Sequence, residues 1–439
     1  MDRRDLGIYG LHRDYALRYA DRGDWEMFLT HAAKAAHTAW TKQLAIPFSL
    51  WSDAELEGKL RDLGALARAG IPSTKPTSPR ALAFVASTLY DMGGHSETLR
   101  IWSELLREEF PRQAVILTGG LNLEHRFPHL EARLREKGLE IVRMDHRQAF
   151  TARLRALLEM LAGGGYVCAL FFIHPDDALA AAAAYGCSGN PPAVFFNHAD
   201  IDFWLGTSCC ERYVDYRSLG AAHSVKARGV RSTRVIPLTS DLRRSSDIRE
   251  AYGIPRDATL SLSLGSFWKS ILDPDLCYFR AVSRVLERYP NHYHIFVTNP
   301  PDAETMVRML PMDGSVSRRF TVTGPHVDVR PFYSSADFLI ETFPLVGGMV
   351  RVEAMALGLP VVGFENREQP LYSSTDALEP SYPFTASDEE SVERLSSAFI
   401  EDASLRSSCG AMLQERFERM FSPAVVRGKL SRLLEEAAA

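Results

Sequence analysis

Hydrophobic and polar positions follow two patterns along the chain. From residue 6 to residue 70, apolar side chains recur at helical spacing and few segments alternate as strands do. From residue 80 onward, short apolar and β-branched runs alternate with longer amphipathic segments. This second pattern is typical of βαβ units in a mostly parallel sheet. The sequence therefore predicts an α/β protein with a helical N-terminal region.

The predicted strands form two groups separated by a turn at residues 251–257. The first group comprises residues 81–86, 113–117, 139–143, 166–173, 193–196, 213–215 and 233–236. The second group comprises residues 259–264, 293–298, 320–323, 338–341 and 361–364. The sequence also predicts a helix that has Ser52 as its N-cap and ends at Gly70. Further helices are predicted at residues 97–109, 176–185, 275–288, 303–310, 387–402, 404–421 and 423–438.

A chain of 439 residues is too long for a single hydrophobic core. Residues 71–79 contain three prolines among small polar residues, which indicates a linker. We expect a helical appendage and linker at 1–78, a first α/β domain at 79–240, a second at 241–420 and a C-terminal helix at 421–439. The appendage has two interpretations, a structural cap on the next domain or a docking module for an acceptor or partner.

Composition and charge narrow the class of protein. Hydrophobic residues make up 46% of the chain and charged residues 24%, as in soluble globular proteins. The net charge of −5 gives no basic footprint for nucleic acid. The most apolar run, residues 166–174, is shorter than the ~20 residues of a membrane span, and no apolar segment follows the charged start. We therefore expect a cytoplasmic protein without a transmembrane segment.

Residues 341–362 contain the first candidate for ligand chemistry. Gly347 and Gly348 precede a predicted helix that carries Glu353. Backbone N–H groups at a helix start attract anions, and glycines let the backbone approach them closely. The segment predicts a diphosphate site with Glu353 near a ribose; the alternative is a loop whose glycines only need positive φ.

A second candidate follows the first strand of the second group. Residues 265–269, Gly-Ser-Phe-Trp-Lys, place Lys269 at the end of that strand. A lysine there can neutralise a phosphate as a point charge. The alternative interpretation is an ordinary surface lysine.

In the first strand group, His95, His174 and His198 each follow a strand end. The carboxyl ends of parallel strands share one edge of a sheet, so three histidines there predict a polar acceptor pocket. One imidazole could take a proton from an acceptor hydroxyl, with Asp200 or Asp202 orienting the ring or serving as the base.

A metal site is the rival interpretation of the same residues. His174 and His198 with Asp176 or Asp200 offer imidazole and carboxylate ligands. The six cysteines include no Cys-x-x-Cys pair, which argues against a zinc ribbon. We expect no metal.

Four ordered segments give the second half a family resemblance. It resembles the GT-B glycosyltransferases, and most of all the protein O-GlcNAc transferase and bacterial protein-glycosyltransferase group. The segments are residues 265–270 (Gly-Ser-Phe-Trp-Lys-Ser), 319–324 (Arg-Phe-Thr-Val-Thr-Gly), 336–344 (Ala-Asp-Phe-Leu-Ile-Glu-Thr-Phe-Pro) and 347–362, from Gly-Gly to Val-Val.

The resemblance implies two Rossmann-like domains that face each other across a cleft, with the nucleotide-sugar donor on the second and the acceptor on the first. It implies a metal-independent reaction without a cofactor, UDP as the bound product, and a C-terminal helix that packs back towards the first domain. The acceptor implied is a protein, a glycan or a small molecule. The oligomeric state is left open.

The resemblance also assigns residues to the donor. Lys269 would bind the diphosphate and Glu353 the ribose. Many family members have Thr where Met349 and Val350 stand, and the spacing from Glu341 to Glu353 differs from the Glu-seven-residues-Glu pattern of many retaining members, which favours inversion. The donor-binding residues are Gly265, Lys269, Gly347, Gly348, Met349, Val350 and Glu353.

The expected reaction is direct displacement at the anomeric carbon, with a base from the group of His95, His198 and Asp200. Two other functions compete. A GT-B nucleotide-sugar 2-epimerase would form product without an acceptor, and a non-catalytic scaffold would bind a sugar nucleotide or a protein without turnover.

Overall fold

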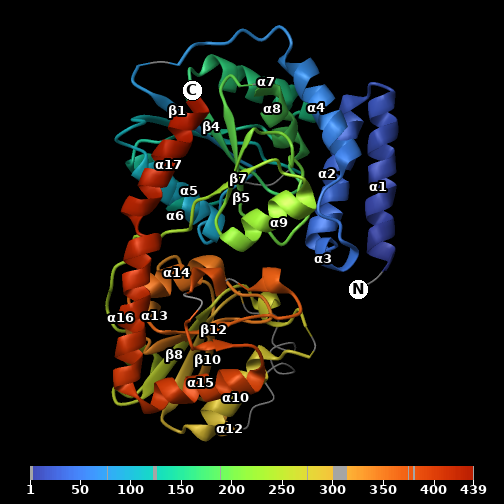
Figure 1. The fold of residues 1–439 in the computed structure, drawn as a ribbon. Helices are drawn as coiled ribbons and strands as arrows, with labels where there is room; N and C mark the ends of the chain where they lie inside the picture. Colours follow the sequence, from blue (N-terminus) through green and yellow to red (C-terminus); the bar gives the residue numbers. More distant parts are fainter. Residues whose placement is uncertain are drawn as a thin grey trace. The chain divides into compact units, whose positions relative to one another are not determined.

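The computed structural model describes residues 3–76, 78–121, 126–187, 189–273, 275–299, 314–373, 375–378 and 381–438. The chain forms two compact units. Unit 1 comprises Met1–Ile236 with Arg427–Ala439, and unit 2 comprises Pro237–Val426. Each unit has one parallel sheet with helices packed against it (Figure 1).

Unit 1 contains a seven-stranded parallel sheet in the order β3-β2-β1-β4-β5-β6-β7. Its central strands are buried along their whole length, as expected for a parallel sheet covered on both faces. The strands are β1 (Ala81–Ala86), β2 (Arg112–Leu117), β3 (Glu140–Arg143), β4 (Cys168–Phe172), β5 (Ala193–Asn197), β6 (Arg212–Asp215) and β7 (Thr233–Val235). The connecting helices are α5 (Gly94–Leu105), α6 (Pro128–Glu136), α7 (Phe150–Gly163), α8 (Ala178–Cys187) and α9 (Ser218–Arg228).

The N-terminal helices share the core of unit 1. They are α1 (Arg3–Asp21), α2 (Trp25–Thr41), α3 (Ala45–Phe48) and α4 (Ala54–Arg68). Helices α2 and α4 contact α7 and α8 (Figure 1), and their apolar side chains belong to the same buried cluster as the sheet. Where α4 meets α8, a Cβ on Gly64 would lie 2.3 Å from the carbonyl oxygen of Ala182, so only glycine permits this approach.

The N-cap of α4 differs from the prediction. Asp53, and not Ser52, caps the helix, because its carboxylate accepts hydrogen bonds from the amides of Glu55 and Leu56 at 3.1 Å each. A carboxylate also suits the positive end of the helix dipole.

Unit 2 contains a six-stranded sheet in the order β10-β9-β8-β11-β12-β13. The strands are β8 (Thr259–Leu264), β9 (His292–Val297), β10 (Phe320–Thr323), β11 (Phe338–Ile340), β12 (Val361–Phe364) and β13 (Thr385–Ala386). The helices are α10 (Tyr278–Arg288), α12 (Gly314–Ser317), α13 (Arg330–Ser335), α14 (Gly348–Ala356), α15 (Glu389–Glu401), α16 (Ala403–Met420) and α17 (Pro423–Ala438), whose last residues belong to unit 1.

Every predicted strand is present, and its ends agree with the prediction to within two residues. The sequence missed β13, which has only two residues and pairs with β12. The helix predicted over 303–310 lies outside the described residues. Among the described helices, none combines the length and the apolar character that a membrane crossing requires.

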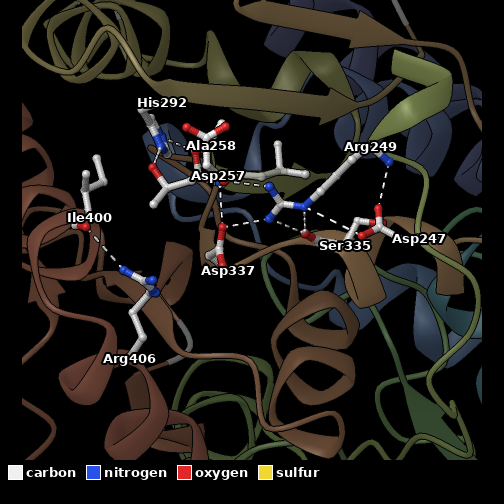
Figure 2. A network of polar contacts seen from close by, with 12 residues as sticks. Asp247, Arg249, Asp257, Ala258, His292, Ser335, Asp337, Ile400 and Arg406 are labelled. Carbon is white, nitrogen blue, oxygen red and sulfur yellow. Dashed lines mark hydrogen bonds and ion pairs between the residues drawn. The ribbon is translucent and has the colours of Figure 1, made fainter. Parts of the chain in front are cut away.

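Arg249 fixes the amino-terminal edge of the sheet in unit 2 (Figure 2). Its guanidinium donates to the carbonyl oxygens of Ala258 (2.6 Å) and Ser335 (2.9 Å) and to Asp337 Oδ2 (2.8 Å). The amide of Leu260 donates to the same carboxylate at 2.7 Å. These bonds join the segment that enters unit 2 to the starts of β8 and β11. They therefore hold the first residues of the two strands side by side.

Candidate functional site

Each sheet has one place where the strand order changes direction. In unit 1 the chain runs outward from β1 to β3 on one side, and β4 then pairs with β1 and starts the other side. In unit 2 the same change occurs between β8 and β11. In open parallel sheets, ligands bind beyond the carboxyl ends of the strands at such a switch point. The predicted site residues follow strands at or next to these two points.

In unit 2, the loops after β8 and β11 contact each other. Gly265 has a φ of 151°, a conformation that favours glycine, and a Cβ there would lie 3.5 Å from the side chain of Thr342. The carbonyl oxygen of Lys269 accepts a hydrogen bond of 3.3 Å from the amide of Leu345. Lys269, which belongs to the short helix η2 (Phe267–Ser270), therefore lies beside the segment that leads to Gly347.

The two glycines of this segment have ordinary backbone angles. Gly347 is the N-cap of α14 with φ −97° and ψ 117°, and Gly348 is the first residue of the helix. A positive φ is therefore not the reason for glycine at either position. Within the part of the chain that the structure describes, no side chain caps the helix. Met349 and Val350 complete its half-exposed first turn. The first-turn amides are thus available to an anion, and the missing Cβ atoms allow close approach.

Glu353 lies on the second turn of α14. Its Oε2 accepts a hydrogen bond of 2.6 Å from the hydroxyl of Tyr333, which also donates to the carbonyl oxygen of Val350 at 3.2 Å. Burial raises the pKa of Tyr333, and the nearby Glu353 adds to this, so the hydroxyl keeps its proton and remains a donor. Tyr333 therefore orients a carboxylate that is itself half-exposed.

A buried ion pair that the sequence did not indicate lies behind this loop. Arg351 Nε donates to Glu341 Oε1 at 2.6 Å, and Nη2 donates to Glu341 Oε2. The amide of Phe364 donates to the same oxygen at 2.9 Å. Both side chains are buried. Glu341 is therefore part of the support beneath α14, because its carboxylate is already held by three donors.

In unit 1, the structure brings the three predicted histidines together. We call His95, His174 and His198 the histidine cluster. The ring centroids of His95 and His198 are 5.1 Å apart with the planes 23° from parallel, those of His95 and His174 are 5.5 Å apart, and those of His174 and His198 are 6.3 Å apart. His95 is the second residue of α5, which follows β1, and His174 and His198 lie in the loops after β4 and β5. The three strands are adjacent in the sheet.

The histidine cluster is uncharged at neutral pH. Burial lowers the pKa of His95 to about 4 and that of His174 to about 3, and it holds the pKa of His198 well below its usual range. Within the described residues, the buried Nδ1 atoms of His174 and His198 have no hydrogen-bond partner. A neutral imidazole nitrogen without a partner can accept or donate a hydrogen bond to a ligand hydroxyl.

The two predicted aspartates have other contacts. Asp200 is buried, and its carboxylate accepts from Arg217 Nε at 2.5 Å and from the hydroxyl of Tyr216 at 3.1 Å. The carbonyl oxygens of Asp200 and Asp202 each accept a 2.7 Å bond from Arg228 Nη2. These contacts hold the loop after β5, the loop that carries His198.

Sequence reasoning missed three side chains near the histidine cluster. Tyr90 and Trp40 contact His174, with ring centroids 5.9 Å and 5.3 Å away, and His37 contacts Asp176. The position of Tyr90, four residues after β1, was a usable signal. His37 and Trp40 lie on α2, and only the packing of that helix brings them to this sheet edge.

In the described ranges, no group of three or more histidine, cysteine, aspartate or glutamate side chains is arranged to hold a metal ion. His174 and His198 come together, while Asp176 and Asp200 are engaged by His37 and Arg217.

Comparison with known proteins gives a fold and no sequence family. No family model and no curated protein matches the sequence. An O-GlcNAc transferase mutant from Thermobaculum terrenum superimposes with a TM-score of 0.60 at 14% identity, over 99% of this chain and 85% of that one. This coverage includes the N-terminal helices.

Two further solved structures match most of the chain. HepE from Anabaena, in complex with UDP and glucose, has a TM-score of 0.62 at 15% identity, over 81% of this chain and 99% of that one. A Listeria monocytogenes structure named as a UDP-N-acetylglucosamine 2-epimerase has a TM-score of 0.52 at 12% identity, over 80% and 95%. The fold is therefore the GT-B fold that the sequence predicted, with parallel sheets of seven and six strands.

Proposed function

We propose that the protein is a glycosyltransferase that moves a sugar from a nucleoside-diphosphate donor, UDP-sugar, to a hydroxyl or other nucleophile of an acceptor. The observation that carries this proposal is the loop before α14. Its two glycines have ordinary φ angles, the helix start has no side-chain cap, and Lys269 lies beside it. Close approach of a diphosphate explains all three features together.

The donor contacts follow from this geometry. The amides from Gly348 to Val350 hold the diphosphate, and the ammonium of Lys269 neutralises it. Lys269 is the only lysine in residues 237–426. Glu353, oriented by Tyr333, accepts hydrogen bonds from the ribose hydroxyls. UDP as the nucleotide is supported by the similarity to HepE, which was solved with UDP.

The chemistry proposed is direct displacement with inversion and without a metal. The acceptor oxygen forms a bond to the anomeric carbon while the bond from that carbon to the diphosphate oxygen breaks. Lys269 and the helix start stabilise the leaving diphosphate. The base proposed for the acceptor proton is His198, which shares with His174 a buried Nδ1 without a protein partner in the described residues. Asp200 supports the loop of His198 through Arg217.

A nucleotide-sugar 2-epimerase is the second candidate, because the fold is shared with the Listeria structure of that name. Such an enzyme needs the same donor site and no acceptor. Release of the nucleoside diphosphate separates the two functions, because a transferase makes free UDP in proportion to glycosylated acceptor.

The test is incubation of the pure protein with a panel of UDP-, GDP- and dTDP-sugars, with and without a library of acceptor sugars and peptides. Product nucleotide and sugar are resolved by chromatography. We expect UDP release that increases with acceptor. Conversion of the UDP-sugar to its 2-epimer without UDP release would establish the epimerase instead, and nucleotide binding without any turnover would establish a scaffold.

A further inference from the structure

Helix α2 supplies side chains to the histidine cluster. His37 Nδ1 lies 2.7 Å from Asp176 Oδ2, and the Trp40 ring lies 5.3 Å from that of His174. Residues three apart share a face of a helix, so both side chains point the same way. The first turn of α2 is also fixed to unit 1, since the Glu26 carboxylate accepts bonds of 2.9 Å from the amides of Phe150 and Thr151 at the start of α7. Contacts in both its first and its last turns therefore hold α2 beside the sheet.

Tyr90 completes an aromatic group around His174. Its ring lies 5.9 Å from that of His174 and within 10° of parallel, and it stands at an angle to His95 at 5.5 Å. The Tyr90 side chain is 41% exposed, and the Trp40 side chain is half-buried. Flat aromatic faces are thus presented from two segments, one after β1 and one on α2, with the buried imidazole of His174 in contact with both.

The polar atoms of this group suit a ligand with hydroxyls and no charge. The Nδ1 atoms of His174 and His198 are buried and without a partner in the described residues. A buried polar atom without a hydrogen bond costs free energy, and a ligand hydroxyl removes that cost. The imidazoles of the cluster are neutral, so they offer no positive charge to a phosphate or carboxylate group. The one carboxylate in the group, Asp176, already pairs with His37.

We propose that Trp40, Tyr90 and the His37–Asp176 pair, with the histidine cluster, form an acceptor site for an uncharged sugar ring. The apolar face of the ring stacks on Tyr90 and Trp40, and its hydroxyls bond to the imidazoles. His37, half-exposed at the rim, reaches the far hydroxyls and keeps Asp176 in place. The N-terminal helices are then part of the substrate site, in addition to packing on the sheet. This rests on the proposed function, since it names the acceptor of the same reaction.

The test measures sugar binding without nucleotide. Saturation-transfer NMR with maltose, cellobiose, lactose and diacetylchitobiose compares the wild type with Trp40→Ala, Trp40→Phe and Tyr90→Ala. Tyr15→Ala is the matched control, because Tyr15 is similarly exposed (40%) but lies on α1. We expect at least one neutral sugar to bind, and its Kd to rise about 3- to 10-fold in each alanine variant. Trp40→Phe, which keeps a flat ring, and Tyr15→Ala should bind like the wild type.

Two results would overturn the proposal. One is equal sugar binding by the wild type and both alanine variants, and the other is binding of none of the four sugars. Transfer to a serine or threonine peptide with an unchanged KM in Tyr90→Ala would also overturn it. UDP binding is measured on the same samples. Absence of UDP binding by the wild-type protein would refute the donor site of the proposed function. The comparison of sugar binding between the wild type and the variants would still decide the acceptor site.

His37 is tested as a positioning residue. His37→Ala should raise the KM for the sugar acceptor while kcat and UDP affinity stay unchanged, and His37→Gln, which can still bond to Asp176, should restore part of the affinity. His31→Ala on the same helix is the control. A fall in kcat without a change in KM would refute the positioning role.

Discussion

The backbone amide of Leu345 donates a hydrogen bond to the carbonyl oxygen of Lys269, with nitrogen and oxygen 3.3 Å apart. This bond joins the loop after β8 to the loop after β11 at the switch point of the sheet in unit 2. Both partners are backbone groups, so the bond is independent of the side chain at position 269. A substitution of the side chain at position 269 therefore leaves both partners of this bond in place.

The first prediction concerns Lys269. Lys269→Ala should reduce UDP release from the UDP-sugar by about 100- to 1000-fold, the effect of losing one group that stabilises the leaving charge. The thermal unfolding midpoint should be unchanged. Arg256→Ala is the control, since Arg256 is an exposed cation just before β8, at the opposite edge of the sheet. If Lys269→Ala turns over the UDP-sugar at a rate within about twofold of the wild type, Lys269 does not belong to the site.

The second prediction concerns Gly347. With φ at −97°, alanine is compatible with the backbone. Among the described residues, its Cβ would meet only the half-buried Val350 side chain, at 3.3 Å. We expect Gly347→Ala to change the free energy of unfolding by no more than about 1 kcal/mol. UDP affinity should fall about 10- to 100-fold, because the methyl group occupies the space of the diphosphate. Urea denaturation and calorimetric titration measure the two effects.

A strongly destabilised Gly347→Ala variant would show that the glycine serves the fold. Gly265→Ala is the useful contrast, because glycine is required there by a φ of 151°. It should lose stability as well as affinity.

The third prediction concerns pH. The pKa of His174 is about 3 in the folded protein against 6.5 for an unperturbed histidine, because the ring is buried. Between these values the unfolded chain binds a proton that the folded chain does not, so stability falls as the pH drops from 6.5 towards 3. One such group contributes a slope of up to about 1.4 kcal/mol per pH unit. His174→Asn should reduce the slope of the unfolding free energy against pH by this contribution, with the free energy measured by urea denaturation at each pH.

The exposed His129 provides the control for this measurement. His129→Gln should leave the slope of the wild type unchanged. An equal slope in His174→Asn and the wild type would mean that His174 is not buried as a neutral ring.

The fourth prediction concerns the Glu341–Arg351 pair. Arg351→Ala leaves a buried carboxylate with no opposite charge, which should cost about 3–5 kcal/mol of unfolding free energy. The double variant Glu341→Gln/Arg351→Met should lose much less. Arg330→Ala, which breaks an exposed pair with Asp328, should cost no more than about 1 kcal/mol. Equal effects of Arg351→Ala and Arg330→Ala would contradict the structural role.

Local signals were enough to predict the strands and the loop before α14. Apolar runs mark buried parallel strands, and the Gly-Gly pair and Lys269 follow strand ends that can be located from the same runs. The sequence predicted that His95, His174 and His198 share one edge of the sheet, but it did not predict that they are in contact. Contact requires that β1, β4 and β5 are neighbours, which the sequence does not reveal.

Other features depend on distant packing and could not be predicted. Arg351 on a helix has the sequence pattern of a surface residue, and its burial against Glu341 appears only when α14 packs on β11 and β12. The approach of α4 to α8 depends on Gly64 fitting against Ala182, a contact between residues that are far apart in the sequence. Local sequence periodicity indicates neither the burial of Arg351 nor the contact between Gly64 and Ala182.

The claim that unit 2 holds a nucleoside diphosphate is tested most directly by calorimetric titration of the wild-type protein with UDP and with UMP. The second phosphate should contact Lys269 and the first turn of α14, so UDP should bind about 10- to 100-fold more tightly than UMP. The difference should disappear in Lys269→Ala. Equal affinity for UDP and UMP, or no binding of UDP, GDP or dTDP, would contradict the proposed donor site.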